Sequence, residues 1–329
     1  MIEIFAYGEF FLITALIFSM MSLGLNLQWG QTGLVNVGVA GFVAIGAYTS
    51  AILTTPDDVA RFGGFGLPIL VGWVGAMAAA GSVAAFIGYT TLRLRDDYLA
   101  ITTFGVATVV QLVALNAKDV TGGPFGIGFI PKPFSSHAEN PAVFNSLNLV
   151  VVVAVVAVLY FTLEHLARSP WGRVLRALRE DERAAVSLGK NVRFYRVQSF
   201  AVGGAIMGLA GAVQAHFIGF IAPENYGAPL TFLVWVMLIV GGTGSNKGAI
   251  VGSVAMWAVW AGSGGVASAL LPTAQQARAA SLQLAGIGII LCVILLIRPN
   301  GLLGDRPLKV RLRSRKAAIP DASEKEATS

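Results

Sequence analysis

The stretch SPWGRVLRALREDERAAVSLGKNVRFYR, residues 169–196, is the one long charged segment between the apolar segments of this chain. Ser169 and Pro170 suit the N-cap and first position of a helix, because a hydroxyl can accept an unpaired backbone N–H there and proline has no N–H to lose. Apolar residues then recur near helical spacing, at Leu175, Leu178, Ala185 and Leu188. Gly189 fits the end of this helix. The pattern predicts either a docking surface or a solvated amphipathic loop that only fixes the topology.

Composition indicates the environment of the chain. Of its 329 residues, 55% are hydrophobic and 12% are charged, whereas soluble domains have about 25% charged residues. A water-soluble protein of this size would need a charged exterior, but most of the charged residues here gather in two short segments. The sequence therefore predicts an all-α, polytopic integral membrane protein. The net charge of +6 is not a nucleic-acid signal, and no nucleic-acid partner is expected.

Two basic segments predict the topology. Their basic residues are Arg168, Arg173, Arg176, Arg179, Arg183, Lys190, Arg193 and Arg196 in the centre, and Arg306, Lys309, Arg311, Arg313, Arg315, Lys316 and Lys325 in the tail. Short loops rich in Lys and Arg stay in the cytoplasm, so both segments are expected on that side. We divide the chain into a transmembrane domain, residues 1–304, with a cytoplasmic loop at 168–196, and a basic cytoplasmic tail without fixed structure, residues 305–329.

Apolar runs predict about nine transmembrane helices, within a range of about eight to ten. The runs cover residues 10–27, 30–53, 67–92, 98–115, 142–165, 197–221, 231–240, 249–261 and 282–297. The first of the two runs discussed next is a poor continuous helix, and the second is marginal for a full span. Residues 30–53 contain several glycines and Asn36, so this segment is expected either beside a pathway or in close helix packing. The run 231–240 is short, and a broken or re-entrant pair around GGTGSNKG, residues 241–248, is its alternative.

The segment TGGPFGIGFIPKP, residues 121–133, lies between two predicted spans on the outer side. Its glycines and prolines specify turns rather than a helix. The segment could contact a partner or only connect the spans, and the sequence favours a connector.

The chain lacks the motifs of an enzyme or of an ATP-binding protein. GGTGSNKG does not have the GxxxxGK[ST] spacing, and neither HExxH nor GxSxG occurs. The single cysteine, Cys292, excludes a disulfide framework and a cysteine metal cluster. Few ionisable groups lie inside the spans, which disfavours an ion-coupled carrier, because a charge at mid-bilayer costs about 3 kcal/mol. We therefore expect no catalytic residue, cofactor or metal, and a driving force that comes from outside the chain.

Six motifs stand in a specific order and spacing along most of the chain. They are GLVNVGVAGFVAIGAYTSAIL (33–53), LRLRDDYLAITTFG (92–105), TGGPFGI (121–127), HFIGFIAPENYG (216–227), VGGTGSNKGAIVG (240–252) and RPNGLLG (298–304). Together they resemble the permease subunits of ABC importers for branched-chain amino acids, particularly the LivM-type. The resemblance implies a transport subunit rather than an enzyme, with ATP hydrolysis in separate partner subunits.

The resemblance further implies that the central loop contains an EAA-like motif, a short coupling helix that enters a groove on the ATPase subunit. Ala184, Ala185 and Gly189 match the A-A-x-x-x-G part of that motif. Arg183 stands where the motif has its first acidic residue, and Glu182 comes directly before it. The residues expected to couple the chain to the ATPase are Arg173, Arg179, Glu182, Ala184, Ala185 and Gly189.

A heteromeric importer in the bacterial inner membrane is the assembly that the resemblance implies. Its other members would be a second related permease (LivH-type), two ABC ATPase subunits and a periplasmic solute-binding protein, with membrane lipid around them. Asn36, Thr49 and Ser50 are assigned to the path of the small-molecule substrate, with packing as the alternative role. Because Asn36 and Val39 stand where many relatives have a small hydroxyl residue and a histidine, urea or short amides are the alternative substrates. An ion-coupled secondary carrier and a membrane enzyme are the rival classes.

Overall fold

The computed structural model describes residues 2–57, 62–91, 96–135 and 141–270, with short pieces between 285 and 304. These residues form helices and contain no strand beyond one isolated antiparallel bridge between Ile127 and Ile221. The elements are α1 (Ile2–Leu25), the π-helix η1 (Asn26–Gln31), α2 (Val39–Thr54), α3 (Ile69–Thr91), α4 (Asp96–Asn116), α5 (Lys118–Thr121), the 3-10 helix η2 (Gly123–Phe125), α6 (Pro141–Arg168), α7 (Pro170–Glu180), α8 (Glu182–Ser187), α9 (Val192–Ile218), the 3-10 helix η4 (Pro223–Tyr226), α10 (Ala228–Gly241) and α11 (Asn246–Leu270).

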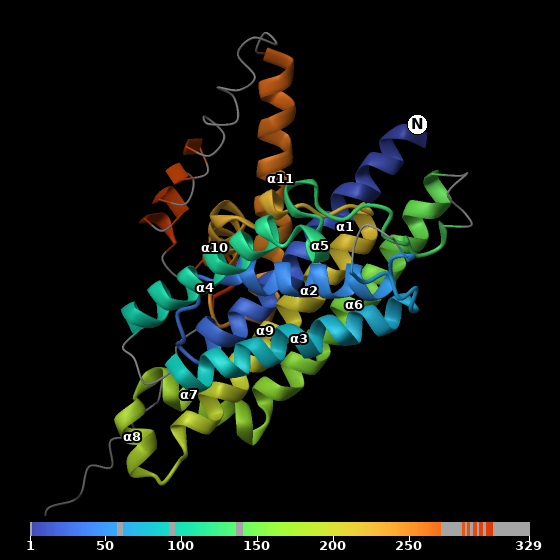
Figure 1. The fold of residues 1–329 in the computed structure, drawn as a ribbon. Coiled ribbons are helices and arrows are strands. Elements are labelled where there is room, and N and C mark those ends of the chain that lie inside the picture. The colour runs from blue at the N-terminus through green and yellow to red at the C-terminus, as the bar shows by residue number, and fades with distance from the viewer. Residues whose placement is uncertain are drawn as a thin grey trace, which may run out of the picture.

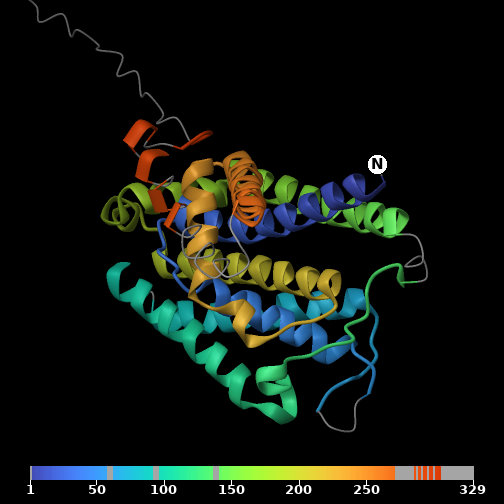
Figure 2. The same cartoon turned by 90° about the horizontal axis from the view of Figure 1, so that it is seen from above.

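Helices α1, α2, α3, α6 and α9 lie side by side as a bundle (Figure 1). The short helices α7 and α8 lie together at one end of this bundle, away from the N-terminus, and we call this the loop end. Helix α4 runs diagonally along the outside (Figure 2), and α11 rises steeply out of the bundle (Figure 1). The residues of the charged loop are therefore gathered at one end of the molecule.

Five segments are long and apolar enough to cross a membrane. They are Tyr7–Gln31, Ile69–Thr91, Asp97–Asn116, Val143–Arg168 and Val192–Ile218. Helices α10 and α11 would add a sixth span as a pair, and Val39–Thr54 is a shorter apolar helix. These findings confirm a polytopic, helical membrane protein. The number of about nine spans stays a prediction, because the run 282–297 is described only in short pieces; the tail 305–329 lies outside the described residues.

The chain is interrupted at the start of the glycine-rich segment 30–53 and after the short run 231–240. After α1 the chain forms the π-helix η1, turns through Gly33 with φ +81°, and begins α2 only at Val39. Helices α10 and α11 bend by 118° at the break between them, which agrees with the broken or re-entrant pair. Irregular backbone inside a membrane protein needs surrounding protein or water to satisfy its polar groups. The two interruptions are thus the places to look for polar contacts.

Small residues bring α2, α3 and α9 into close contact. A Cβ built on Gly46 of α2 would lie 2.0 Å from the carbonyl oxygen of Gly208 on α9. A Cβ on Gly208 would in turn lie 2.4 Å from the Cβ of Ala80 on α3. Membrane helices pack through small residues because their association gains little from the hydrophobic effect. These three helices form the tightest part of the bundle.

Candidate functional site

The charged loop folds as two helices. The Ser169 side chain accepts a hydrogen bond from the backbone N–H of Gly172 at 3.4 Å, and Pro170 is the first residue of α7, so the predicted start is confirmed. The helix predicted to end at Gly189 is interrupted at Asp181, whose backbone is extended. The Asp181 carboxylate accepts from the N–H groups of Arg183 (2.8 Å) and Ala184 (3.0 Å) and thereby caps α8. Because the Asp181 side chain can cap a new helix, it favours the start of α8 over the extension of α7.

Helix α8 contains the part of the loop that matches the EAA-like motif. Ala185 is buried and Ala184 is exposed, and Gly189 follows the helix with φ +73°, which suits glycine. Leu188 was predicted on the apolar face, but it is 77% exposed, and Val186 is 55% exposed. Val186 and Leu188 thus form an exposed apolar surface on α8 and the residue after it, which the sequence pattern did not predict.

Three further residues expected in coupling lie on the edges of the two helices. Arg173 is exposed on α7. Glu182 forms an ion pair of 3.0 Å with Arg196, whose side chain is 14% exposed and belongs to α9. The Arg179 guanidinium donates a hydrogen bond from Nη1 to the carbonyl oxygen of Gly30 in η1. The six coupling residues thus lie on α7, on α8 and in the turn that follows α8, and Arg179, Glu182 and the buried Ala185 contact other parts of the chain.

The contact between α7 and the first interruption is direct. Leu175 and Leu178 of α7 are buried. A Cβ on Gly33 would lie 3.3 Å from Cγ of Arg179, so the last turn of α7 rests on the backbone that follows η1. Arg179 thus contacts the segment between Gly30 and Gly33 through both its hydrogen bond and its side-chain carbons.

Buried amides join the two interruptions to each other. The Asn26 Nδ2 donates to Asn246 Oδ1 (3.0 Å), and the Gly244 N–H donates to Asn26 Oδ1 (2.8 Å). Gln31 also donates to Asn246 Oδ1 at 3.2 Å, while Asn246 Nδ2 donates to Glu164 Oε2 at 3.2 Å. This network was missed by the sequence analysis. Its signal was the amide side chains that interrupt the apolar sequence near the end of the first span.

The three residues assigned to the substrate path are not brought together. Asn36 is fully buried, donates to Gln28 Oε1 (2.6 Å) and accepts from the N–H of Gly38 (2.7 Å). Ser50 is also fully buried and forms a hydrogen bond of 2.8 Å with Nε2 of His216 on α9. Thr49 is half-buried on the side of α2 that faces α3. Packing therefore accounts for the polar groups of Asn36 and Ser50, and their assignment to the path stays a prediction.

His216 has a defined orientation. Its Nδ1 lies 2.7 Å from the carbonyl oxygen of Pro131, which can only accept, so Nδ1 is the donor. In the neutral ring Nε2 then accepts a hydrogen bond from the Ser50 hydroxyl group. The pair ties α2 to α9 and to the segment before α6.

Replacing Ser50 with alanine is expected to lower the stability of the chain by about 1–3 kcal/mol, because His216 would lose its buried partner. Thr49→Ala, which removes a half-buried hydroxyl one position away, should have a smaller effect. Thermal unfolding of the two variants in the same detergent measures the difference. An unchanged midpoint for Ser50→Ala would contradict the packing role.

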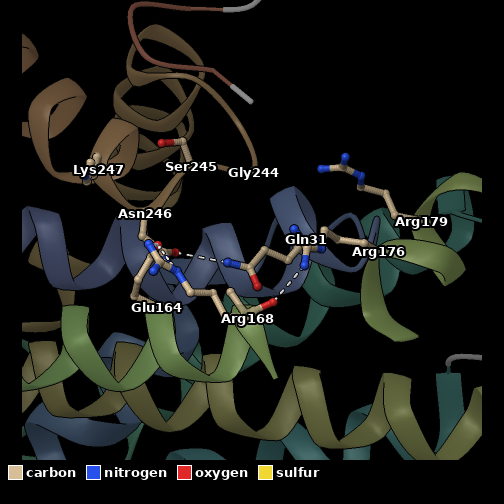
Figure 3. A pocket seen from close by; sticks show the side chains of 10 residues that line it. Gln31, Glu164, Arg168, Arg176, Arg179, Gly244, Ser245, Asn246 and Lys247 are labelled. Atoms are coloured by element: carbon tan, nitrogen blue, oxygen red, sulfur yellow. Dashed lines mark hydrogen bonds and ion pairs between the residues drawn. The ribbon is translucent and has the colours of Figure 1, made fainter. Parts of the chain in front are cut away.

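Two cavities lie near the interruptions. The first, of ≈ 200 Å³, lies at the loop end between η1, the end of α6, α7 and the start of α11 (Figure 3). The second, of ≈ 550 Å³, is an apolar hollow along α10, with Leu230, Leu233 and Val236 on its wall and Trp260 opposite. Neither is lined by the three residues assigned to the path. In the part of the chain that the structure describes, no three His, Cys, Asp or Glu residues are arranged to hold a metal ion.

The apolar spans, with two interrupted elements joined by buried amides, define a polytopic helical membrane protein. The chain belongs to the family described as branched-chain amino acid transport system / permease component, whose model matches residues 8–295. This family consists of transport subunits and not of enzymes.

Curated relatives agree with this family. The high-affinity branched-chain amino acid transport system permease protein LivM of Escherichia coli is 35% identical over 260 residues, which are 73% of this chain and 59% of that protein. The probable LivM of Methanocaldococcus jannaschii is 28% identical over 72% of this chain and 75% of its own length. The E. coli permease protein LivH is 26% identical over 87% of this chain and 91% of its own length. The match thus spans less than two thirds of E. coli LivM. No solved structure matches the chain.

Proposed function

We propose that the chain is one membrane-spanning permease subunit of an ATP-driven importer for branched-chain and related hydrophobic amino acids. The names of its relatives support this substrate class. The contact of Arg179 with the carbonyl oxygen of Gly30 is the observation in this structure that supports coupling to an outside motor. Its partners would be a second, LivH-type permease, two ABC ATPase subunits and an external solute-binding protein.

The proposed orientation places the loop end in the cytoplasm of the cell, with the complex in the bacterial inner membrane. The loop between Arg168 and Arg196 is short and contains many arginines, and such loops remain on the cytoplasmic side. The opposite end, with the segment 121–133, would then face the solute-binding protein. Helices α7 and α8 would meet the ATPase subunits.

In the proposed mechanism the movement passes from the loop to the interruptions. Closure of the ATPase dimer on ATP displaces α8, whose exposed Val186 and Leu188 offer an apolar contact. Helix α7 shifts with it, and Arg179 transmits the shift to η1. The hydrogen bonds of Asn26 and Gln31 to Asn246 then carry it to the break between α10 and α11. An interruption that moves as a unit can open or close a path between two permease subunits.

The assembled complex in proteoliposomes tests this proposal. Uptake of labelled leucine should require ATP and the solute-binding protein, and it should stop when the ATPase subunits are hydrolysis-dead. Valine and isoleucine should compete with leucine, whereas urea and acetamide should not. Leucine uptake that continues with dead ATPase subunits would contradict an ATP-driven importer, and competition by urea or acetamide would favour the alternative substrates.

The external segment offers a specific docking surface for the solute-binding protein. Phe125 and Phe129 are 87% and 94% exposed, although the segment is held by the hydrogen-bonded pair Ile127 and Ile221. Phe129 also adopts φ +55°, an unfavourable conformation for a residue with a Cβ. Exposed aromatic side chains on a fixed backbone are typical of contact hot spots, because little conformational entropy is lost on binding.

Replacing Phe129 with serine is expected to weaken docking of the solute-binding protein about tenfold, which corresponds to about 1.4 kcal/mol. The change should raise the concentration of binding protein needed for half-maximal uptake and leave the maximal rate nearly unchanged. Phe62→Ser is the control, since Phe62 is 67% exposed and its N–H bonds to the carbonyl of Asp119 at the same end. Equal effects of both substitutions would argue against a specific docking role.

A further inference from the structure

The cavity at the loop end is strongly basic. Its volume is ≈ 200 Å³, and it is lined by the cationic side chains of Arg168, Arg176, Arg179 and Lys247, with Glu164 as its one carboxylate. Arg176 and Arg179 extend into it from α7, and Lys247 belongs to the first turn of α11 on the opposite wall (Figure 3). Four positive groups around one small cavity repel each other unless an anion lies between them.

Glu164 is already engaged on both oxygens and cannot balance this charge. Its Oε1 accepts from Nε and Nη2 of Arg168, at 3.0 and 2.7 Å. Its Oε2 accepts from Nδ2 of Asn246 at 3.2 Å. One cation is therefore paired, and the other three cations lining the cavity have no carboxylate partner among the described residues.

Arg176, Arg179 and Lys247 have hydrogen-bond donors that are not used within the described residues. Arg176 donates Nη2 to the carbonyl oxygen of Ala167 at 3.0 Å, and Arg179 donates Nη1 to Gly30. Each guanidinium has five N–H donors, so several remain on both. Lys247 is exposed and has no hydrogen-bond partner in the described ranges. The cavity thus presents unused donors of formal positive charge from two different elements.

We propose that this cavity binds a phosphate group, and that it does so as a site for the head of an anionic phospholipid or for a free phosphate. Guanidinium groups bind phosphate oxygens in pairs, and an ammonium adds a point charge. With about 30 Å³ for one water molecule in the liquid, the cavity has room for a phosphate and its nearest waters. A zwitterionic amino acid fits less well, because its ammonium would find Glu164 occupied.

The location favours the lipid as the source. The cavity lies at the ends of the membrane-spanning segments Tyr7–Gln31 and Val143–Arg168, where lipid head groups lie in a bilayer. Basic pockets between membrane helices on the cytoplasmic side bind such head groups. A bound phosphate would join α7 to α11 and so hold the coupling loop against the break that follows α10. This inference rests on the proposed orientation but not on transport itself.

The test uses the full-length chain in nanodiscs of phosphatidylcholine, with or without phosphatidylglycerol. Native mass spectrometry after detergent extraction counts the phosphatidylglycerol that stays bound, and calorimetry with inorganic phosphate in phosphatidylcholine discs tests the free anion. The cavity variant is Arg176→Gln with Lys247→Gln. The control is Arg183→Gln with Lys190→Gln, which removes equal charge from α8 and the turn after it, outside the cavity. Lys247→Gln alone is a milder change at an exposed side chain.

Retained phosphatidylglycerol should fall at least about tenfold in the cavity variant, about fivefold in Lys247→Gln, and little in the control. The same pattern with inorganic phosphate alone would support the site and assign it to a free anion. Equal losses in the cavity and control variants, or no binding of either probe, would overturn the proposal. Because no uptake is measured, failure here is separate from failure of the importer proposal.

Discussion

Replacing Arg179 with methionine is expected to reduce ATP-driven uptake at least about tenfold while the ATPase subunits continue to hydrolyse ATP, since coupling free energies of about 1–3 kcal/mol correspond to factors of about 5 to 150. Methionine keeps much of the side chain's length and apolar contact with the backbone near Gly33 but cannot donate to the carbonyl oxygen of Gly30. The loop would then move without displacing η1. Leucine uptake and phosphate release are measured in parallel in proteoliposomes, and their ratio gives the leucine taken up per ATP hydrolysed.

Two comparisons make this result specific. Arg179→Lys keeps one donor and should retain more coupling than methionine. Glu182→Arg should also impair uptake, but through its ion pair with Arg196. Combining it with Arg196→Glu reverses the pair and should restore part of the loss, whereas a direct contact of Glu182 with the ATPase would not be restored. Wild-type uptake per ATP in Arg179→Met would refute transmission through Gly30.

Local sequence signals predicted several elements of this fold. Ser169 and Pro170 begin α7 where the capping chemistry requires it. The glycines of residues 30–53 favoured an irregular segment, and α2 begins only at Val39. For the short run 231–240 a broken or re-entrant pair was the alternative, and the chain does bend at the break that follows this run. Such features depend on a few neighbouring residues, so composition and spacing are sufficient to find them. The break at Asp181 was not predicted. It arises because the Asp181 carboxylate caps α8 by accepting from the backbone N–H groups of Arg183 and Ala184, and the spacing of apolar residues carries no information about such a cap.

Contacts between distant segments could not be predicted in this way. Asn26 and Asn246 are 220 positions apart, yet their side chains form a buried hydrogen bond. Nothing in the spacing near either residue identifies the other, and each amide alone is an unfavourable group in a membrane. The same holds for Ser50, which was assigned to the substrate path, because nothing near it in the sequence identified His216 as its hydrogen-bond partner. In this chain, the polar side chains were recognisable from sequence, but their partners were not.

Replacing Gly46 with alanine is expected to prevent α2 from packing on α9. The added Cβ would lie 2.0 Å from the carbonyl oxygen of Gly208 and 2.4 Å from its Cα, and backbone atoms cannot move aside as a flexible side chain can. Overpacking of a core commonly costs about 1–3 kcal/mol, and a clash with the backbone at 2.0 Å should exceed that range. The variant should lose thermal stability strongly or fail to elute as a single species from size exclusion in detergent.

The decisive comparison is Gly105→Ala on α4, because it makes the same chemical change where a Cβ meets no atom within 4 Å. Alanine is favoured over glycine inside a helix by about 0.5–1 kcal/mol, so this control should be neutral or slightly stabilising. The two substitutions are thus expected to change the stability in opposite directions. If every helical glycine were intolerant of alanine, both substitutions would be destabilising. If Gly46→Ala were as stable as Gly105→Ala, the backbones of α2 and α9 could not be in the close contact that leaves no room for a methyl group at Gly46.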